Sequence, residues 1–478
     1  MKLLSLCAGS ALALMAGAAS ATAYVTDPAG SGMPFSNYQP SLVLTQTIAL
    51  EGIFPPIACC NTSYAYIGMI HSFAGNFGYD DMPKAQGQIY PIQGNTTPFS
   101  ILGTMYGGDG NTTFGLPDLG GRVAIGAGQG PGLPNFAIGE QVGSANVGLS
   151  VANLPSHTHD VAPGVPSSPT GGNTPFDNYQ PSLAMSYFIS TEGIYPSQDG
   201  GSGRTMIGEV ALFAGNFAPG NWLAANGQLL SVTDYDTLFS IIGTTYGGDG
   251  VDTFALPDLR GRTIIGAGQG PGLANYALGE TTGTPTVTLS EAQMPTHDHD
   301  LPTGGSSDDT GGGAPFDTYQ PSLALNYIIA TEGLFPGIGC CGSVNPDSPV
   351  LGEVIAFTGD FAPRGWALAN GQLLQISQNT ALFSILGTQF GGNGQTTFAL
   401  PDLRGRAIVG WNANFSVGEQ LGSTFTTLTE DNLARHTHAY DLAATPGVPE
   451  PASWAMMIAG LGLAGAVLRR RATAVRFA

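Results

Sequence analysis

The sequence is poor in charged residues, and basic residues are the scarcest of them. Charged residues make up 10% of the 478 residues, with 14 lysines and arginines against 34 aspartates and glutamates, so the formal net charge is −20. Nucleic-acid binding needs a basic surface, and this composition therefore argues against nucleic acid as a partner. An acidic body with few lysines is typical of an exported protein that like charges keep soluble.

Cysteine is also scarce, with five in the whole chain. Cys7 lies in an apolar segment at the N-terminus, and the others form the adjacent pairs Cys59-Cys60 and Cys340-Cys341. An even number of cysteines in an oxidising compartment favours disulfides. Adjacent cysteines bridge each other only with strain, so bonds between the two pairs are the better hypothesis. No CxxC spacing supports a zinc site at these residues.

Glycine and proline, in contrast, are abundant. The chain contains 71 Gly and 34 Pro, and its hydrophobic fraction is 42%. Such a composition favours turns and short strands over long helices. The hydrophobic fraction is sufficient for packed cores and is not typical of disorder. We therefore predict a mainly β fold with short helices.

The N-terminus has the three parts of a signal peptide. Lys2 supplies the positive end, residues 3–16 form an apolar run, and residues 21–23 (ATA) form a small-residue cleavage site. The alternative is a membrane anchor, but the apolar run is short and small residues follow it. We predict that residues 1–23 are a signal peptide and that the protein is exported.

The C-terminus combines a Pro-Glu-Pro sequence, an apolar stretch over residues 452–468 and an arginine cluster. The apolar stretch is near the minimum length for a transmembrane helix, and the arginines predict that its end stays in the cytoplasm. A plain anchor is the alternative. The order of these features over residues 449–478 resembles the PEP-CTERM sorting signal of Gram-negative bacteria. The signal residues are Pro449, Glu450, Pro451, Arg469, Arg470 and Arg471.

That resemblance implies processing by an exosortase-type enzyme. It also implies transient anchoring in the inner membrane through residues 452–468, and a destination at the cell surface or in the extracellular matrix.

The interior of the chain repeats a ten-residue sequence three times. TFALPDLRGR occurs at residues 253–262 and again, unchanged, at 397–406. The copy at residues 113–122 differs only at Gly115 and Gly120. A glycine-rich turn precedes each copy, and a His-x-His sequence follows each one. Such fixed periodicity indicates three modules of one architecture.

Each module begins with a sequence similar to FSNYQPSL and an apolar segment whose period fits a buried strand or a short helix. Its β-branched and aromatic content favours the strand. In the third module, residues 352–357, 407–409 and 426–428 are predicted strands, and residues 379–386 a predicted helix. The predicted modules span 35–160, 176–300 and 316–441, and the predicted linkers span 161–175, 301–315 and 442–448.

The opening strand, NGQLL, ILGTxYGGDG, TFALPDLRGR, Leu-Gly-Glu and His-x-His occur in the order found in the phage tail collar family, which is also met in bacterial microcystin-dependent proteins. The chain resembles three tandem members of that family. In the family, the QPxLxLNYII sequence usually follows a body. Here one copy precedes the first body and none follows the third, so we expect a sheet completed by exchange around the chain.

The His-x-His sequences are the strongest candidate for chemistry. On an extended segment, residues i and i+2 point the same way, so both imidazoles can face one ion. The resemblance to trimeric short tail fibres, in which such pairs gather around an axial metal, implies one transition metal ion in an internal pseudo-trimer. Zinc is the first choice, and six imidazoles also suit iron or nickel. The alternative is histidines that bond to the backbone. The predicted ligands are His157, His159, His297, His299, His436 and His438.

The other polar motifs fit structural roles. The arginines of TFALPDLRGR suggest an anion site, but Gly120 replaces one of them in the first module, so a turn with an Asp–Arg pair is the better interpretation. Glu140, Glu280 and Glu419 are predicted turn residues, and Ser290 is a predicted helix cap.

No nucleophile with its own base is visible, and no pair of carboxylates recurs as glycosidase chemistry requires. We predict a monomeric binding or adhesion protein rather than an enzyme, with a glycan, a matrix component or a protein as its ligand. A structural matrix component is the alternative, and a glycan hydrolase ranks third.

Overall fold

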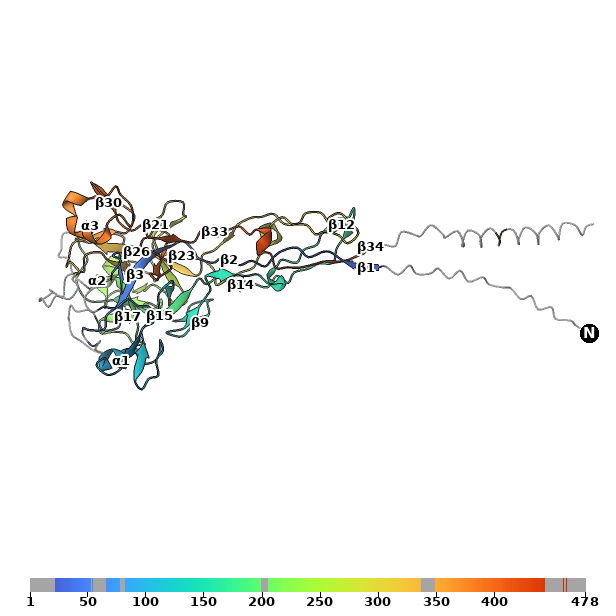
Figure 1. Cartoon of the computed structure of the whole chain (residues 1–478). Coiled ribbons are helices and arrows are strands. Elements are labelled where there is room, and N and C mark those ends of the chain that lie inside the picture. The colour runs from blue at the N-terminus through green and yellow to red at the C-terminus, as the bar shows by residue number, and fades with distance from the viewer. Residues whose placement is uncertain are drawn as a thin grey trace, which may run out of the picture.

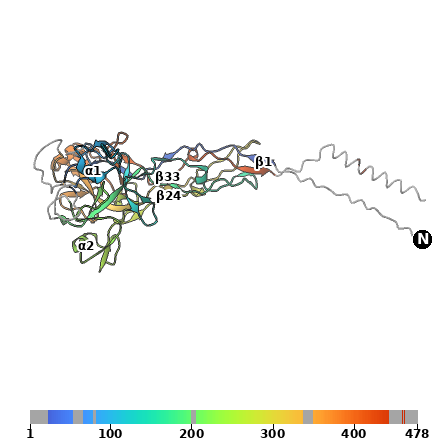
Figure 2. The same cartoon turned by 90° about the horizontal axis from the view of Figure 1, so that it is seen from below.

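The computed structural model describes residues 22–52, 54, 66–77, 82–198, 205–336 and 349–442, and the isolated residues 459 and 461. The fold is mainly β with short helices, as the sequence predicts. It consists of a broad head and a narrow stem (Figure 1). Strands β1 (Thr22–Val25) and β34 (Ala439–Leu442) pair antiparallel at the end of the stem that lies away from the head (Figure 2).

Each module contributes one long strand to the head, and this strand is the apolar segment that follows the QPSL sequence. The hydrophobic character of these strands is continuous because both faces are covered, and nearly all of their residues are buried. The prediction of a strand rather than a helix is therefore confirmed. The three long strands are β3 (Ser41–Ile48), β15 (Ser182–Ser190) and β26 (Ser322–Ala330).

Each long strand joins two modules. The first half of β15 runs parallel to β7 (Val123–Gly126) of the first module, and its second half runs antiparallel to β16 (Glu209–Phe213) of the second. Strand β26 joins β20 (Thr263–Gly266) to β27 (Glu353–Phe357) in the same way.

Strand β3, near the N-terminus, pairs with β31 (Ala407–Gly410) of the third module and with β4 (Met69–Phe73) of the first. The expected exchange around the chain is therefore confirmed, because the first long strand completes the sheet of the last body.

The central strands of the three modules also pair with one another. Strand β16 pairs with β27 and with β4, and β27 pairs with β4. Together with the long strands and their edge partners they form one sheet of 14 strands. The shorter members are β10 (Gln141–Val142), β17 (Trp222–Ala224), β23 (Thr281–Thr282), β28 (Trp366–Leu368) and β32 (Gln420–Leu421).

A short helix and a two-stranded sheet lie at the outside of each module, and the helix comes between the two strands in the sequence. Each helix packs a phenylalanine on its sheet, for example Phe239 on Phe254 with ring centroids 5.4 Å apart. The predicted helix over 379–386 is confirmed as α3. The helices are α1 (Thr96–Leu102), α2 (Asp236–Ile242) and α3 (Thr380–Leu386), and the two-stranded sheets pair β5 (Ile89–Pro91) with β6 (Thr113–Gly115), β18 (Leu229–Ser231) with β19 (Thr253–Ala255), and β29 (Leu373–Gln375) with β30 (Thr397–Ala399).

Glycine allows neighbouring modules to approach closely. A Cβ added at Gly266, the last residue of β20, would lie 2.1 Å from the carbonyl oxygen of Leu403 in the third module. Gly126 meets Leu259 in the same way, and Gly410 meets Leu119. The backbone of each of the three repeated ten-residue sequences therefore packs against the last residue of a strand in another module, namely β7, β20 or β31. This close contact leaves no room for a side chain at those glycines.

The stem is built from three sets of short strands around a narrow apolar core. Phe35, Phe176 and Phe316 meet edge-to-face, with ring centroids 5.8, 5.6 and 5.9 Å apart. Ser290 caps a 3-10 turn with a capping box, as predicted. The three sets are β2 (Phe35–Ser36) with β11 (Asn146–Val147), β14 (Phe176–Asp177) with β24 (Thr286–Val287), and β25 (Phe316–Asp317) with β33 (Phe425–Thr426). The stem also contains the pair β12 (Asp160–Ala162) with β13 (Val165–Pro166).

Two of the segments expected to be linkers, 161–175 and 301–315, are part of the stem, and the third, 442–448, lies outside the described residues except for Leu442. After the first His-x-His the chain turns at β12–β13 and returns alongside it, where His157 and Thr170 form a β-bridge. The second module repeats this arrangement with His297 and Thr310. Beside the third His-x-His, the returning segment is the N-terminal one, since Ala29 bridges His436.

Several predictions lie outside the described residues. These are the four cysteines Cys59, Cys60, Cys340 and Cys341, and the sorting-signal residues Pro449, Glu450, Pro451, Arg469, Arg470 and Arg471. Residues 1–21 of the signal peptide also lie outside, as does the apolar stretch 452–468 except for residues 459 and 461. Within the described part of the chain, no helix combines the length and the apolar character needed to cross a membrane.

Candidate metal centre

The structure brings all six predicted metal ligands together inside the stem. Each His-x-His is extended, and both of its imidazoles point inward. The most exposed of the six side chains, that of His436, is only 4% exposed. Rings from different modules lie close together: His159 and His299 have centroids 4.7 Å apart, and His299 and His438 4.9 Å.

The first histidine of each pair is oriented by its own backbone. Its Nδ1 donates to the carbonyl oxygen two residues earlier, at 2.8 Å from His157 to Pro155. The same bond joins His297 to Pro295 at 3.1 Å and His436 to Ala434 at 2.9 Å. Local chain geometry therefore determines which nitrogen of each ring faces inward.

The second histidine of each pair is oriented by a returning segment of another module. Its Nδ1 donates to a backbone carbonyl oxygen that lies far away in the sequence. The bonds join His159 to Asp308 at 2.8 Å, His299 to Asp27 at 2.8 Å and His438 to Ser168 at 3.0 Å. These carbonyl anchors were missed by the sequence analysis, because a backbone oxygen has no sequence signature.

These bonds define the protonation of the rings. A carbonyl oxygen accepts and never donates, so every Nδ1 carries a hydrogen and every Nε2 of a neutral ring is an unprotonated acceptor. The Nε2 atoms nevertheless lie close together, at 3.1 Å between His157 and His436 and 3.3 Å between His297 and His436. Two acceptors at this distance repel each other unless a cation lies between them.

The other three Nε2 atoms reinforce this observation. Those of His159, His299 and His438 are buried and have no hydrogen-bond partner within the described residues. Leaving a buried polar atom unpaired is costly, and such atoms in a native structure call for a ligand. The alternative of histidines bonded to the backbone is therefore correct for Nδ1 and leaves Nε2 unexplained.

A proton cannot supply the missing charge at neutral pH. Burial, together with repulsion from the neighbouring histidines, lowers the pKa of His436 to about 3. Burial likewise lowers the pKa of His297 and of His438 to about 4. The rings are therefore neutral at pH 7, which is the form that binds metals.

The donor set could hold a transition metal ion. The ligand nitrogens of His157, His159, His436 and His438 all lie within 4.8 Å of one another, and those of a second group of four, which brings in His297 and His299, do so as well. Around one octahedral ion about 2.1 Å from each nitrogen, all six nitrogens would lie within about 4.2 Å of one another, so the two groups of four would have to draw together to bind the ion with all six rings. Nitrogen donors of this kind suit zinc, iron or nickel.

The structure gives the remaining polar motifs structural roles. Arg260 binds Asp258 through Nε and Nη2 at 2.9 and 2.8 Å, and Arg404 binds Asp402 in the same way. Glu280 accepts a hydrogen bond from the backbone of Ala277 and so closes a turn. These arrangements match the predicted turns and Asp–Arg pairs rather than an anion site.

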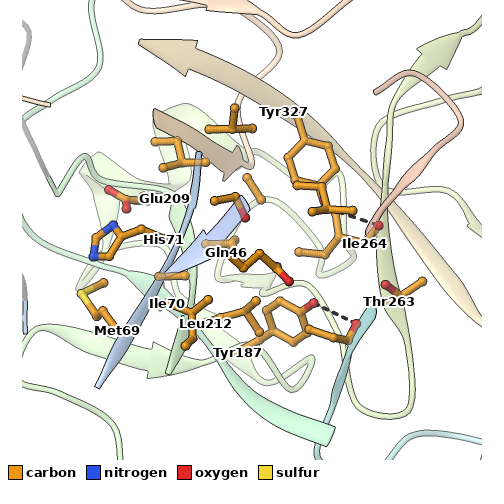
Figure 3. A pocket seen from close by; sticks show the side chains of 18 residues that line it. Gln46, Met69, Ile70, His71, Tyr187, Glu209, Leu212, Thr263, Ile264 and Tyr327 are labelled. Atoms are coloured by element: carbon orange, nitrogen blue, oxygen red, sulfur yellow. Dashed lines mark hydrogen bonds between the residues drawn. The ribbon is translucent and has the colours of Figure 1, made fainter. Parts of the chain in front are cut away.

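The head also contains a small cavity where the central strands meet (Figure 3). Its volume is about 50 Å³, which suits water rather than an organic ligand. Tyr187 and Tyr327 line it and donate to the carbonyl oxygens of Ala124 and Ile264. Gln46 occupies the corresponding position of β3, is shorter, and has an Oε1 without a partner among the described residues. The cavity is therefore a packing difference between modules and not the candidate site.

Comparison with known families agrees with the repeats. The family model described as Phage Tail Collar Domain matches residues 68–124, 208–264 and 352–408. The model described as PEP-CTERM protein-sorting motif matches residues 447–471. No curated protein matches the chain, and no solved structure does. The chain thus contains three collar domains and a C-terminal sorting motif that indicates export to the cell surface or matrix.

Proposed function

Because the chain carries three collar domains and an export-sorting motif, we propose that it is an exported binding protein whose three modules form one internal threefold assembly around a metal ion. The observation that carries this proposal is the meeting of three His-x-His pairs, one from each module, in a single buried cluster. One chain thus supplies all three histidine pairs, so it does not need two further chains to complete the cluster.

The strand exchange supports a monomer. Every long strand finds partners in two modules of the same chain, and β3 closes the series with β31. The edges that would otherwise recruit a second chain are thereby paired. Sedimentation of the intact exported protein should give a monomer. A stable trimer of chains would refute the internal assembly.

The metal is tested by elemental analysis of the same protein. We expect about one zinc, iron or nickel ion per chain, because the cluster forms one set of converging nitrogens. Replacing His297 and His299 together by Ala should remove the ion and lower the melting temperature. Asp298→Ala is the matched control, since this exposed residue lies between the two histidines. Metal-free wild-type protein with the same melting temperature as the double variant would reject the proposal.

The position of the sorting motif supports an outward-facing head. The motif begins at residue 447, and the described chain reaches the end of the stem at β34, away from the head. An exosortase-type enzyme would process the motif after transient insertion in the inner membrane of a Gram-negative cell. The stem would then hold the head away from the surface, where it is available for contact.

The head presents one exposed aromatic residue per module beyond the end of each long strand. Phe54 and Tyr195 are 50% exposed, and Phe335 is 58% exposed. Exposed aromatic residues in equivalent positions are typical of contact surfaces. They support binding or adhesion to a glycan, a matrix component or a protein.

A structural matrix component without a receptor is the second candidate, favoured by the tail-fibre character of the collar family. Binding of the intact protein to a glycan array or to cell-surface polysaccharide separates the two functions. Selective binding supports adhesion, and uniform absence of binding supports the structural role. Turnover of the polysaccharide would indicate a glycan-active enzyme instead.

A further inference from the structure

We propose that the groove between the first and second modules is a binding subsite for one uncharged sugar ring. This inference rests on the proposed binding function and identifies a ligand class for it. None of the six clustered histidines lines this groove. It is formed where β7 of the first module meets β15 and the TFALPDLRGR sequence of the second.

The groove has the size and the walls of a small-molecule site. Its volume is about 330 Å³, within the range of about 300–1,000 Å³ that is usual for ligand pockets. Phe136, Ile138 and Phe188 form apolar walls, and Ala127 leaves the space between them open. Apolar walls of this kind cover the C–H faces of a sugar ring.

Polar groups at the groove can bind the hydroxyl groups of the ring. The Oδ1 atom of Asn226 is buried and has no partner within the described residues, so it is an acceptor that calls for a donor. Asn216 is exposed at the rim. Arg260 uses Nε and Nη2 for Asp258, which leaves the Nη1 donors for a ligand. Hydroxyl groups donate and accept, so they match this mixture of donors and acceptors.

Charge selects against an anionic sugar. The positive charge of Arg260 is neutralised by the two-point bond with Asp258, and the protein has a net charge of −20. An anionic ligand would find no uncompensated cation here and would be repelled by the protein as a whole. At the boundary between the second and third modules, Asp360 stands at the position of Asn216. The groove between the first and second modules therefore lacks this negative charge.

At the third boundary, where β31 of the third module meets the first module, the equivalent groove is closed. Trp411 stands at the position of Ala127, and the Lys84 ammonium lies 3.6 Å from the centre of its ring. Gln86, at the position of Asn226, donates from Nε2 to the carbonyl oxygen of Trp411 at 2.9 Å. The bulky side chain thus occupies the space that Ala127 leaves open, and the amide there has its partner.

This difference supplies the test. The intact exported protein is titrated calorimetrically with methyl glycosides of glucose, galactose and mannose, with N-acetylglucosamine, and with glucuronate as the anionic comparison. We expect at least one uncharged sugar to bind with one site per chain and to bind more tightly than glucuronate. Ala127→Trp should weaken the binding of that sugar by at least about tenfold, because the indole ring fills the groove.

Two further variants keep the result interpretable. Asn226→Leu leaves the walls in place and should also weaken binding by about tenfold, even if Ala127→Trp fails to fold. Ala292→Trp places the same indole on the exposed surface of the stem and should bind like the wild type. Melting curves check that each variant is folded.

The inference is overturned if no uncharged sugar binds, if glucuronate binds best, or if both groove variants bind like the wild type. Adhesion to cell-surface polysaccharide is measured in parallel. If adhesion persists while free sugars do not bind, the subsite is refuted and the binding function stands. If adhesion is also absent, both proposals fail.

Discussion

The carbonyl oxygen of Asp27 accepts a hydrogen bond from Nδ1 of His299 at 2.8 Å, although the two residues lie in different halves of the chain. Asp308 does the same for His159, and Ser168 does it for His438. The N-terminal segment therefore has the role that the returning segments 163–174 and 302–314 have after the first two modules. The chain does not turn back after the third His-x-His within the described residues, and the N-terminal segment takes the place of a third returning segment.

This equivalence predicts that the chain ends can be moved. A circular permutant that joins Leu442 to Tyr24 through a short flexible linker and opens between Pro163 and Gly164 should fold, because Pro163 and Gly164 are exposed at a turn. We expect a melting temperature and a metal content close to those of the wild type. Opening the chain between Pro295 and Thr296 is the control, because it cuts the carbonyl anchor of His297. Equal behaviour of the two permutants would contradict the stem architecture.

Gly266 is predicted to be intolerant of a side chain. Gly266→Ala would place a Cβ 2.1 Å from the carbonyl oxygen of Leu403, and the two modules would have to separate. We expect a loss of about 1–3 kcal/mol in the free energy of unfolding, measured with urea. Gly148→Ala is the control, since the nearest atom to its added Cβ is 3.9 Å away. A Gly266→Ala variant as stable as the Gly148→Ala variant would show that the module contact is not tight.

Asp249 is predicted to make the protein sensitive to acid. Its carboxylate accepts hydrogen bonds from the backbone of Thr253, Val251 and Asp252, which lower its pKa to about 2. The folded pKa lies below the ordinary aspartate value near 4, so this stabilisation is complete above about pH 4 and is lost as the pH falls through about 2.

Asp249→Asn should therefore reduce the loss of stability between pH 4 and pH 2, measured by urea unfolding at each pH. Asn393 makes the same backbone bonds in the third module, which shows that the amide fits the turn. Identical pH profiles of variant and wild type would disprove this role of Asp249.

Gln46→Tyr is predicted to stabilise the head. Tyr187 and Tyr327 occupy the corresponding positions and donate hydrogen bonds to carbonyl oxygens. Gln46, in contrast, leaves a cavity of about 50 Å³, and its Oε1 has no partner in the described part of the chain (Figure 3). Filling the cavity should raise the free energy of unfolding by about 0.5–2 kcal/mol. Tyr187→Gln should have the opposite effect. A lower melting temperature for Gln46→Tyr would mean that the cavity cannot accept the ring.

The repeated parts of the molecule were predictable because equivalent sequences must occupy equivalent environments. The long strands, helix α3, the cap at Ser290 and the pairing of Asp258 with Arg260 all follow from local pattern. The convergence of the histidines was predictable from the count of ligands, because two imidazoles per module make a site only when the modules meet.

The stem was less predictable. The segments 163–174 and 302–314 are rich in small and polar residues, and such composition indicates a linker. Their position in the stem is determined by backbone contacts, such as the β-bridge between Thr170 and His157. Contacts of this kind leave no pattern in the sequence. The close approach of Gly266 to Leu403 and the space left by Ala127 likewise depend on tertiary contacts between modules.

The pairing of β1 with β34 has a consequence for biogenesis. Strand β1 lies at the start of the described chain and is synthesised and delivered across the membrane early, yet its partner, β34, is among the last segments to follow. Contacts of such large sequence separation form late, because a long loop must close first. The early segment must therefore wait unpaired until translocation of the third module is complete. The pairing of β3 with β31 and the assembly of the histidine cluster therefore come last, after the third module has been delivered.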